Sequence, residues 1–251
     1  MKINRFQLSK SFTSGTIIVF VFYVILAIFT LGLRNTSLAG ISASQILYIP
    51  ILIGIVGMGW GAYNFTYDDK EPWEKGRLIS FFLIGGAVIL FLGQISLIIA
   101  GFDEVQKVPI RLSYFFIGNI LMIISCIILA IGFVLLRKQL LGLYFKKIFI
   151  KNPNAFVVFS YILQTLAYCL FFSAYFMVNV KPEVSIMEFL QVNTGFSILQ
   201  LNILIQNQVI LDASGIGLIV LALIFLLVGF IPINISFRTY PHLVEDEKLR
   251  K

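Results

Sequence analysis

Charged residues are scarce in this chain. They make up only 12% of the 251 residues, whereas apolar residues make up 59%. A soluble domain is typically about 25% charged and about 45 to 50% apolar. The composition therefore excludes an ordinary soluble domain and predicts a chain embedded in a membrane. Because the polar stretches are also too short for a soluble domain of their own, we expect a single membrane domain over residues 1–251.

Histidine and cysteine are almost absent. The single histidine, His242, lies near the C-terminus, which excludes a haem b carrier and the His-Glu helix pair of a zinc protease. The two cysteines, Cys126 and Cys169, fall near the middle of two long apolar runs and are too few to complete a metal site. Small buried thiols of this kind usually serve packing, and whether the two meet stays open. We therefore expect no cofactor and no metal.

Six long apolar runs dominate the rest of the chain. A transmembrane helix needs about 20 mostly apolar residues to cross about 30 Å of hydrocarbon. Barrel strands would be about ten residues long and alternate in polarity, which these runs do not. The predicted fold is an all-α polytopic integral membrane protein with six transmembrane helices, at roughly 15–33, 45–64, 78–101, 112–136, 156–179 and 213–235.

None of the six predicted spans contains Asp, Glu, Lys, Arg or His in its interior. Such groups are costly in hydrocarbon, so where they occur they usually mark proton relays and ion-coupled pumps. Their absence argues against both classes of protein. The most polar side chains that remain are Gln94, Asn119 and Gln164, and two interpretations stay open for them. They form hydrogen bonds between helices, or they line a polar path.

Lysine and arginine are distributed asymmetrically over the predicted loops. Fifteen of the nineteen fall on the side of the two termini, and four fall on the other side. Because cytoplasmic loops retain these residues, we predict that both termini are cytoplasmic. This bias accounts for the net charge of +7 without a nucleic-acid partner. The predicted location is the cell (plasma) membrane.

Two predicted loops offer surfaces for partners. The basic cytoplasmic loop over 137–155 is expected to leave the span near residue 136 and to lie in the membrane plane, binding anionic lipids or a cytoplasmic protein. Its basic residues are Arg137, Lys138, Lys146, Lys147 and Lys151. The external loop over 180–212 is apolar, and we expect it to cover the helix ends, to meet another subunit or to recognise a ligand.

The second span ends in GIVGMGWG, where Gly57 and Gly61 have the spacing of a close helix contact. In lipid, small residues let helix backbones approach for van der Waals packing. The alternative is an opening or hinge lined by glycine.

The stretch YDDKEPWEKGR, residues 67–77, is the most densely charged part of the chain. Asp68 and Asp69 resemble in type the aspartates with which lipid-modifying membrane enzymes hold Mg²⁺ and a diphosphate, but such sites need further carboxylates on the same side. We favour a solvated turn between two spans, with Trp73 touching the lipid headgroups.

No motif in the chain is specific enough to indicate a family. The leading hypothesis is a non-catalytic multi-pass membrane protein, an accessory or scaffold subunit of a larger membrane complex or a sensor module, with lipid and protein partners in the membrane. The alternative is a permease or facilitator for a neutral or apolar solute. The third hypothesis is a lipid-modifying enzyme that uses the Asp68 and Asp69 loop.

Overall fold

A computed structural model describes most of the helical part of the chain. The described residues are 5–32, 37–38, 41–67, 73–101, 108–145, 155–178, 211, 214–215 and 217–235. The labelled helices are α1 (Arg5–Gly32), α2 (Ala43–Phe65), α3 (Gly76–Gly101), α4 (Val108–Phe145) and α5 (Phe156–Val178). A last helix, named here the 217–235 helix, covers Gly217–Ile235.

Five of these helices are long and apolar enough to cross a membrane: α2 to α5 and the 217–235 helix. The first helix, α1, contributes a shorter apolar segment over Phe12–Ile25. Helices suit this setting because each one satisfies its backbone hydrogen bonds internally, and lipid offers no other partner. The architecture is that of a polytopic membrane protein, with six apolar helices where six spans were predicted.

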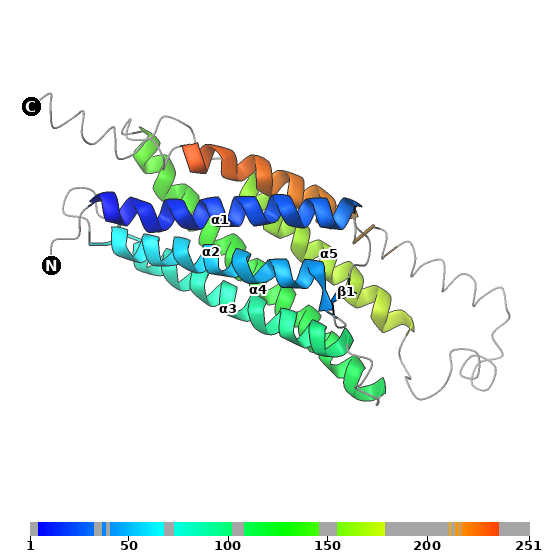
Figure 1. Ribbon diagram of the computed structural model, residues 1–251. Coiled ribbons are helices and arrows are strands. Elements are labelled where there is room, and N and C mark those ends of the chain that lie inside the picture. The colour runs from blue at the N-terminus through cyan, green and yellow to red at the C-terminus, as the bar shows by residue number, and fades with distance from the viewer. Residues whose placement is uncertain are drawn as a thin grey trace, which may run out of the picture.

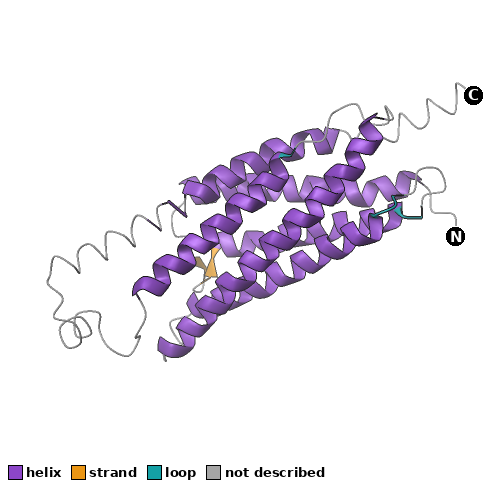
Figure 2. Ribbon diagram, turned by 180° about the vertical axis from the view of Figure 1, so that it is seen from behind, coloured by secondary structure: helices purple, strands orange, loops and turns teal. Residues whose placement is uncertain are grey.

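The helices run along one common axis as an elongated bundle (Figure 1). Helices that follow one another in the chain pack together, from α1 against α2 through to α4 against α5. Between α1 and α2 the chain forms a short antiparallel hairpin, β1 (Ser37–Leu38) and β2 (Ile41–Ser42), in which Leu38 pairs with Ile41 (Figure 2). This hairpin is an addition to the predicted all-α fold.

Helix α4 is longer than the predicted span. It continues without a break through Arg137 to Phe145, so residues 137–145 are helical rather than the beginning of a loop. Residues 146–154 lie outside the described part of the chain. The physical reason is that arginine, lysine, glutamine and leucine are all good helix formers, so the end of the apolar run did not end the helix. With 38 residues, α4 is about 57 Å long, well beyond the hydrocarbon thickness of about 30 Å.

Small residues bring two pairs of helices into close contact. A Cβ atom on Gly15 of α1 would lie 2.6 Å from the Gly54 carbonyl oxygen of α2. Between α3 and α4, a Cβ atom on Gly118 would lie 3.2 Å from the carbonyl oxygen of Gly93. We call the second contact the glycine seam, and its members recur every seven residues: Gly86 and Gly93 on α3, and Gly118, Ser125 and Gly132 on α4. A seven-residue spacing keeps the small residues of each helix on one face.

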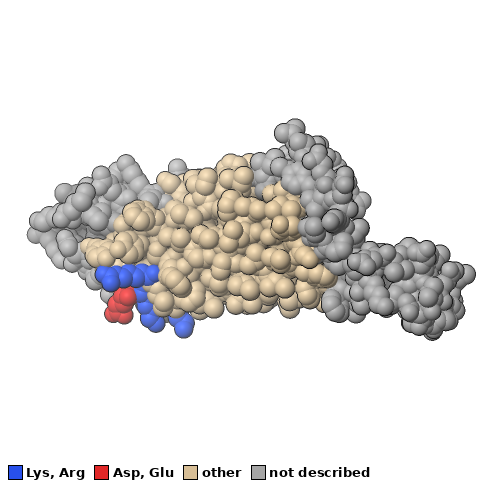
Figure 3. All heavy atoms as spheres, turned by 90° about the horizontal axis from the view of Figure 1, so that it is seen from below, with Lys and Arg blue, Asp and Glu red and all other residues tan. Residues whose placement is uncertain are grey.

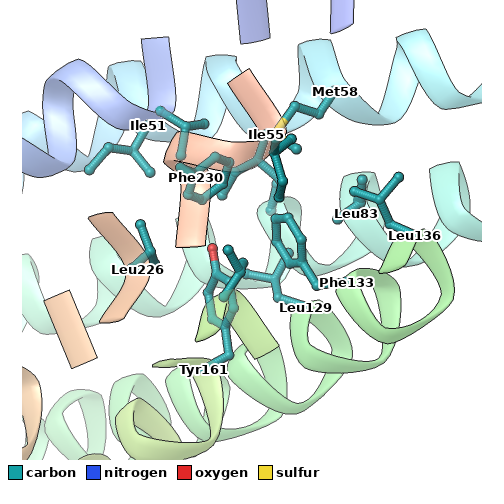
Figure 4. Close-up of a cluster of buried hydrophobic side chains, with 14 of the residues drawn as sticks. Ile51, Ile55, Met58, Leu83, Leu129, Phe133, Leu136, Tyr161, Leu226 and Phe230 are labelled. Atoms are coloured by element: carbon teal, nitrogen blue, oxygen red, sulfur yellow. The ribbon is translucent and has the colours of Figure 1, made fainter. Parts of the chain in front are cut away.

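Large side chains fill the space between α4, α5 and the 217–235 helix. Phe133 of α4 stacks on Tyr161 of α5, with ring centroids 5.3 Å apart, and meets Phe230 edge to face at 5.8 Å. The three rings point toward one another at the centre of the core (Figure 4). The core extends from there to Ile51 and Ile55 of α2 and so joins all layers of the bundle.

Trp73 is buried in the turn between α2 and α3, where only 1% of its surface is exposed. Its ring stacks on Phe65 at 4.6 Å and meets Phe12 of α1 edge to face at 5.9 Å. Its backbone N–H donates a hydrogen bond to the Phe65 carbonyl over 2.9 Å. The prediction that Trp73 touches lipid headgroups is therefore wrong. The indole fills the space between Phe12 of α1 and Phe65 of α2.

Candidate functional site

Four tyrosines from three helices form a polar cluster inside the bundle. Tyr23 of α1 and Tyr161 of α5 lie with their hydroxyl oxygens 3.4 Å apart. Tyr48 of α2 and Tyr168 of α5 share a second hydrogen bond. Cys126 of α4 lies buried near all four phenols. We call these five residues the tyrosine cluster, and it connects α1, α2, α4 and α5.

The inward face of α5 extends this cluster towards the 217–235 helix. Ser160 donates a 2.6 Å hydrogen bond to the backbone carbonyl of Ala222, and Gln164 donates to the Ser160 hydroxyl over 3.3 Å. These side chains share one face because Ser160, Gln164 and Tyr168 are four residues apart in a helix. An apolar-looking helix therefore carries a polar stripe that faces its neighbours.

The side chains of this cluster are suited to hydrogen bonding between helices. Inside the described spans, the buried polar side chains carry hydroxyls, amides and one thiol. Buried polar groups are stable when each has a partner, and in lipid such partners hold helices together. Tyr161 illustrates this role, because its ring stacks on Phe133 while its hydroxyl points away from α5 towards the layer of α1 and α2 (Figure 4).

The three predicted amides are all buried, but they belong to separate local contacts. Gln94 of α3 donates to the Met122 sulfur of α4 over 3.6 Å. Asn119 donates over 2.9 Å to the Phe115 carbonyl, one turn back in its own helix. Gln164 belongs to the Ser160 contact between α5 and the 217–235 helix. The structure thus places Gln94 at the α3–α4 interface, Asn119 against its own helix and Gln164 at another interface.

The two predicted packing glycines differ in their surroundings. Gly61 faces α1, where an added Cβ atom would lie 2.7 Å from the Cβ of Phe12. Gly57 is half-buried in the same helix. Gly54, three residues before it, also faces α1, because a Cβ atom there would lie 2.6 Å from the Val19 side chain and 2.9 Å from the Gly15 carbonyl oxygen.

The described charged side chains gather at one end of the bundle, which we call the charged end (Figure 3). They are Glu74, Lys75 and Arg77 around the start of α3 and Arg137 and Lys138 in the last third of α4. Arg137 is half-buried, and its Nε has no hydrogen-bond partner among the described residues. Lys138 is exposed. Lys146, Lys147 and Lys151, together with Asp68 and Asp69, have no described side chains.

A row of aromatic rings leads along α2 to the charged end. Trp60 stacks on Tyr63 with ring centroids 5.9 Å apart, and the hydroxyls of Tyr63 and Tyr67 lie 3.1 Å apart. Arg77 donates a 2.9 Å hydrogen bond to the Tyr67 hydroxyl. The hydrogen bond with Tyr63, and then the Arg77 guanidinium, lower the pKa of Tyr67 below its ordinary value. Trp60 is 57% exposed, as expected for a ring at a membrane interface.

The two cysteines are both free thiols. Cys126 is buried within the tyrosine cluster, whereas Cys169 is exposed on α5. The two residues are therefore not joined as a disulfide.

Comparison with known proteins gives no relative. No family model matches the sequence, and no curated protein or solved structure is significantly similar to it.

Sequence reasoning missed the tyrosine cluster. The sequence singled out Gln94, Asn119 and Gln164 as the polar groups of the spans, and no tyrosine was among them. One signal was available in α5, where Tyr161, Gln164 and Tyr168 recur at helical spacing within an apolar run. The partners Tyr23 and Tyr48 come from helices far away in the sequence, and spacing alone gives no indication of those contacts.

Proposed function

We propose that this protein is a non-catalytic integral membrane subunit that acts by binding other membrane components, as an accessory or scaffold subunit of a larger membrane complex. The observation that supports this proposal best is the use of its interior polar groups. Ser125 donates to the Gly86 carbonyl of α3, Ser160 donates to the Ala222 carbonyl, and Tyr23 meets Tyr161. Each of these contacts joins two different helices.

The packing supports the same proposal. Tyr161, Phe133 and Phe230 are fully or almost fully buried and in ring contact where three helices meet. The glycine seam brings α3 and α4 together elsewhere. A permeation route would need polar groups facing a shared space, whereas Gln94 and Gln164 belong to different interfaces. A packed bundle of this kind is suited to contact through its outer surface.

We also propose that the charged end faces the cytoplasm. The positive-inside rule supports this orientation, because the loops on that side hold most of the lysines and arginines. Arg77 lies at the start of α3, and Arg137 and Lys138 lie near the end of α4, which runs back to the same end of the bundle (Figure 1). The test is labelling of single cysteines placed at Glu74 and Lys138 in intact cells, after Cys126 and Cys169 are replaced by serine. Labelling by a membrane-impermeant reagent without lysis would overturn the orientation.

The subunit proposal is tested by photo-crosslinking in the native membrane. A photoreactive residue at Phe81, which is 70% exposed on the outer face of α3, is paired with a matched control at the buried Leu83 of the same helix. Further exposed positions are Ile53 on α2 and Leu166 on α5. We expect one discrete protein adduct from positions on one face, retained in stoichiometric amount when the protein is purified in mild detergent.

If the protein purifies alone and every exposed position yields only lipid adducts, the subunit proposal fails. Glycerol uptake into proteoliposomes that is lost in Gln164→Leu, with unfolding unchanged, would favour the permease instead. Turnover of a prenyl diphosphate that needs Mg²⁺, Asp68 and Asp69 would favour the enzyme.

A further inference from the structure

A groove lies between α4 and α5 on the outer face of the bundle, with a volume of about 370 Å³. Ile127, Ile131 and Val134 form its α4 wall, and Val158, Ile162 and Leu166 form its α5 wall. Most of these side chains are exposed, so the groove opens to the lipid. Its volume falls at the low end of the range for ligand pockets, about 300 to 1,000 Å³.

The wall of the groove presents no free hydrogen-bond donor to an occupant. Thr165 also lines it, but the Thr165 hydroxyl already donates a 2.9 Å hydrogen bond to the Tyr161 carbonyl of its own helix. The matching occupant is therefore a hydrocarbon chain. An apolar groove by itself distinguishes little between occupants, because the surrounding lipid is equally apolar. Selectivity has to come from the end of the groove.

Basic groups lie at one end of the groove. Lys138 continues the α4 wall, because Ile127, Ile131, Val134 and Lys138 follow one another at steps of three or four residues along the helix. The neighbouring Arg137 lines a smaller hollow with Val157 and Val158 in the first turn of α5. Val158 borders both spaces, so the groove and this hollow adjoin. The half-buried Arg137, whose buried Nε has no hydrogen-bond partner among the described residues, and the exposed Lys138 thus lie at the same corner.

The length of this arrangement matches one leaflet of a bilayer. Ile127 and Lys138 are eleven residues apart in one helix, which corresponds to about 16 Å along its axis. Half of the hydrocarbon thickness is about 15 Å. A lipid with one acyl chain against Ile127 and Val134 would therefore bring its phosphate to the level of Lys138. A transmembrane helix would need a longer surface, since such helices pack along most of about 30 Å.

We propose that the α4–α5 groove is a binding site for one anionic glycerophospholipid from the leaflet at the charged end. One acyl chain occupies the groove, and the phosphate accepts hydrogen bonds from Lys138 and Arg137. The positive end of the α5 helix dipole favours negative charge at the same place. This inference goes beyond the proposed subunit function and does not depend on it, because the lipid would bind with or without a protein partner.

The test is native mass spectrometry of the full-length protein released from micelles that contain equal amounts of phosphatidylglycerol and phosphatidylcholine. We expect one retained phosphatidylglycerol in the wild type. Lys138→Gln should lower its occupancy relative to phosphatidylcholine about fivefold, the effect of about 1 kcal/mol per basic residue near a membrane surface. Ile131→Trp should remove the bound lipid by filling the groove.

Two matched controls separate this site from general lipid contact. Lys75→Gln removes a charge at the same end of the bundle but outside the groove, and Val88→Trp enlarges an exposed side chain on α3. Both should retain the lipid. The exposed Lys138 can be replaced without disturbing the core, so folding, checked by thermal unfolding, does not limit the test.

Three outcomes would overturn the proposal. One is equal retention of the two lipids by the wild type, which would indicate annular lipid only. Another is a loss of phosphatidylglycerol in Lys75→Gln as large as in Lys138→Gln. The last is that Ile131→Trp releases a bound protein and leaves the lipid count unchanged.

Discussion

The two sides of α4 are built differently. Towards α3, the glycine seam brings the backbones close together, and a Cβ atom on Gly86 would lie 2.8 Å from the Leu129 side chain. Towards α5, the contact is made by large rings such as Phe133 and Tyr161, and a groove of about 370 Å³ remains between the helices. Both sides lack the hydrophobic driving force that water supplies to soluble proteins.

The difference shows two ways of joining helices in lipid. Small residues give many van der Waals contacts over a continuous surface and leave no room between the helices. Bulky rings such as Phe133 and Tyr161 separate the backbones and give strong contact at fewer points. The space left between those points is where the groove lies. The side of α4 on which we propose a lipid site is therefore the side without the glycines.

The largest effect is expected when the aromatic side loses its central ring. Phe133→Ala removes the stack on Tyr161 and the edge contact with Phe230 and leaves a cavity. We expect a loss of about 3 kcal/mol in the free energy of unfolding, at the low end for a buried Phe→Ala change because the surrounding lipid is also apolar. Unfolding in mixed detergent micelles measures it. Phe91→Ala, at an exposed ring of α3, is the control, and an equal loss there would contradict the comparison.

A larger side chain in the glycine seam should lower the free energy of unfolding, because the neighbouring side chains leave no space for it. Gly86→Leu has to displace Leu129 and Ile128, and overpacking of this kind costs about 1 to 3 kcal/mol. Its neighbour gives a matched control, because a Cβ atom on Gly85 meets nothing within 4 Å. Gly85→Leu should be neutral, or stabilising by up to about 1 kcal/mol through helix propensity. The same unfolding measurement decides, and two equal destabilisations would show that the seam is not tightly packed.

Removing a serine hydroxyl that bonds to a neighbouring helix should lower the stability less than either change above. Ser160→Ala removes the bond to the Ala222 carbonyl together with the acceptor of the Gln164 side chain, and Ser125→Ala removes the bond to the Gly86 carbonyl. Interhelical bonds in membranes average about 0.6 kcal/mol and reach about 1.7 kcal/mol. We expect both losses within that range, while Ser14→Ala, at an exposed position of α1, changes nothing. A loss several times larger than this range would contradict the expectation.

The smallest effect is expected where a polar contact lies outside the spans. Arg77→Gln removes a donor from Tyr67, so the pKa of Tyr67 should rise towards its ordinary value of about 10. Because the wild-type pKa is lowered in the folded state, its contribution to stability appears only at alkaline pH and disappears as the pH falls. Stability at neutral pH should therefore stay the same. Phenolate absorbance measures the titration, and Tyr67→Phe identifies the signal; an unchanged titration in Arg77→Gln would contradict the expectation.

Much of the fold was predictable from the sequence because the membrane imposes a strong constraint. A run of about 20 apolar residues can hardly be anything other than a helix in lipid, and α2, α3 and α5 lie close to their predicted spans. The end of α4 was not predictable in the same way. Arg137 marks where the apolar run ends, but a helix ends only where its backbone hydrogen bonds end.

The site was harder to predict because its contacts join distant segments. Tyr23 and Tyr161 are 138 residues apart in the chain, and no local pattern relates them. Trp73 gave a misleading signal, since a tryptophan within a charged stretch is typical of a membrane interface. Its burial depends on Phe12 of α1 and Phe65 of α2, which meet only after the helices have packed.

Helix α4 takes part in both kinds of interface as one unbroken element of 38 residues. A stiff rod cannot tilt on one side without tilting on the other, and the glycine contacts leave it no clearance towards α3. An occupant thicker than one acyl chain would therefore have to displace α5. The Ser160 bond to Ala222 would move the 217–235 helix with it, and Tyr161 would carry the displacement to Tyr23 in the tyrosine cluster.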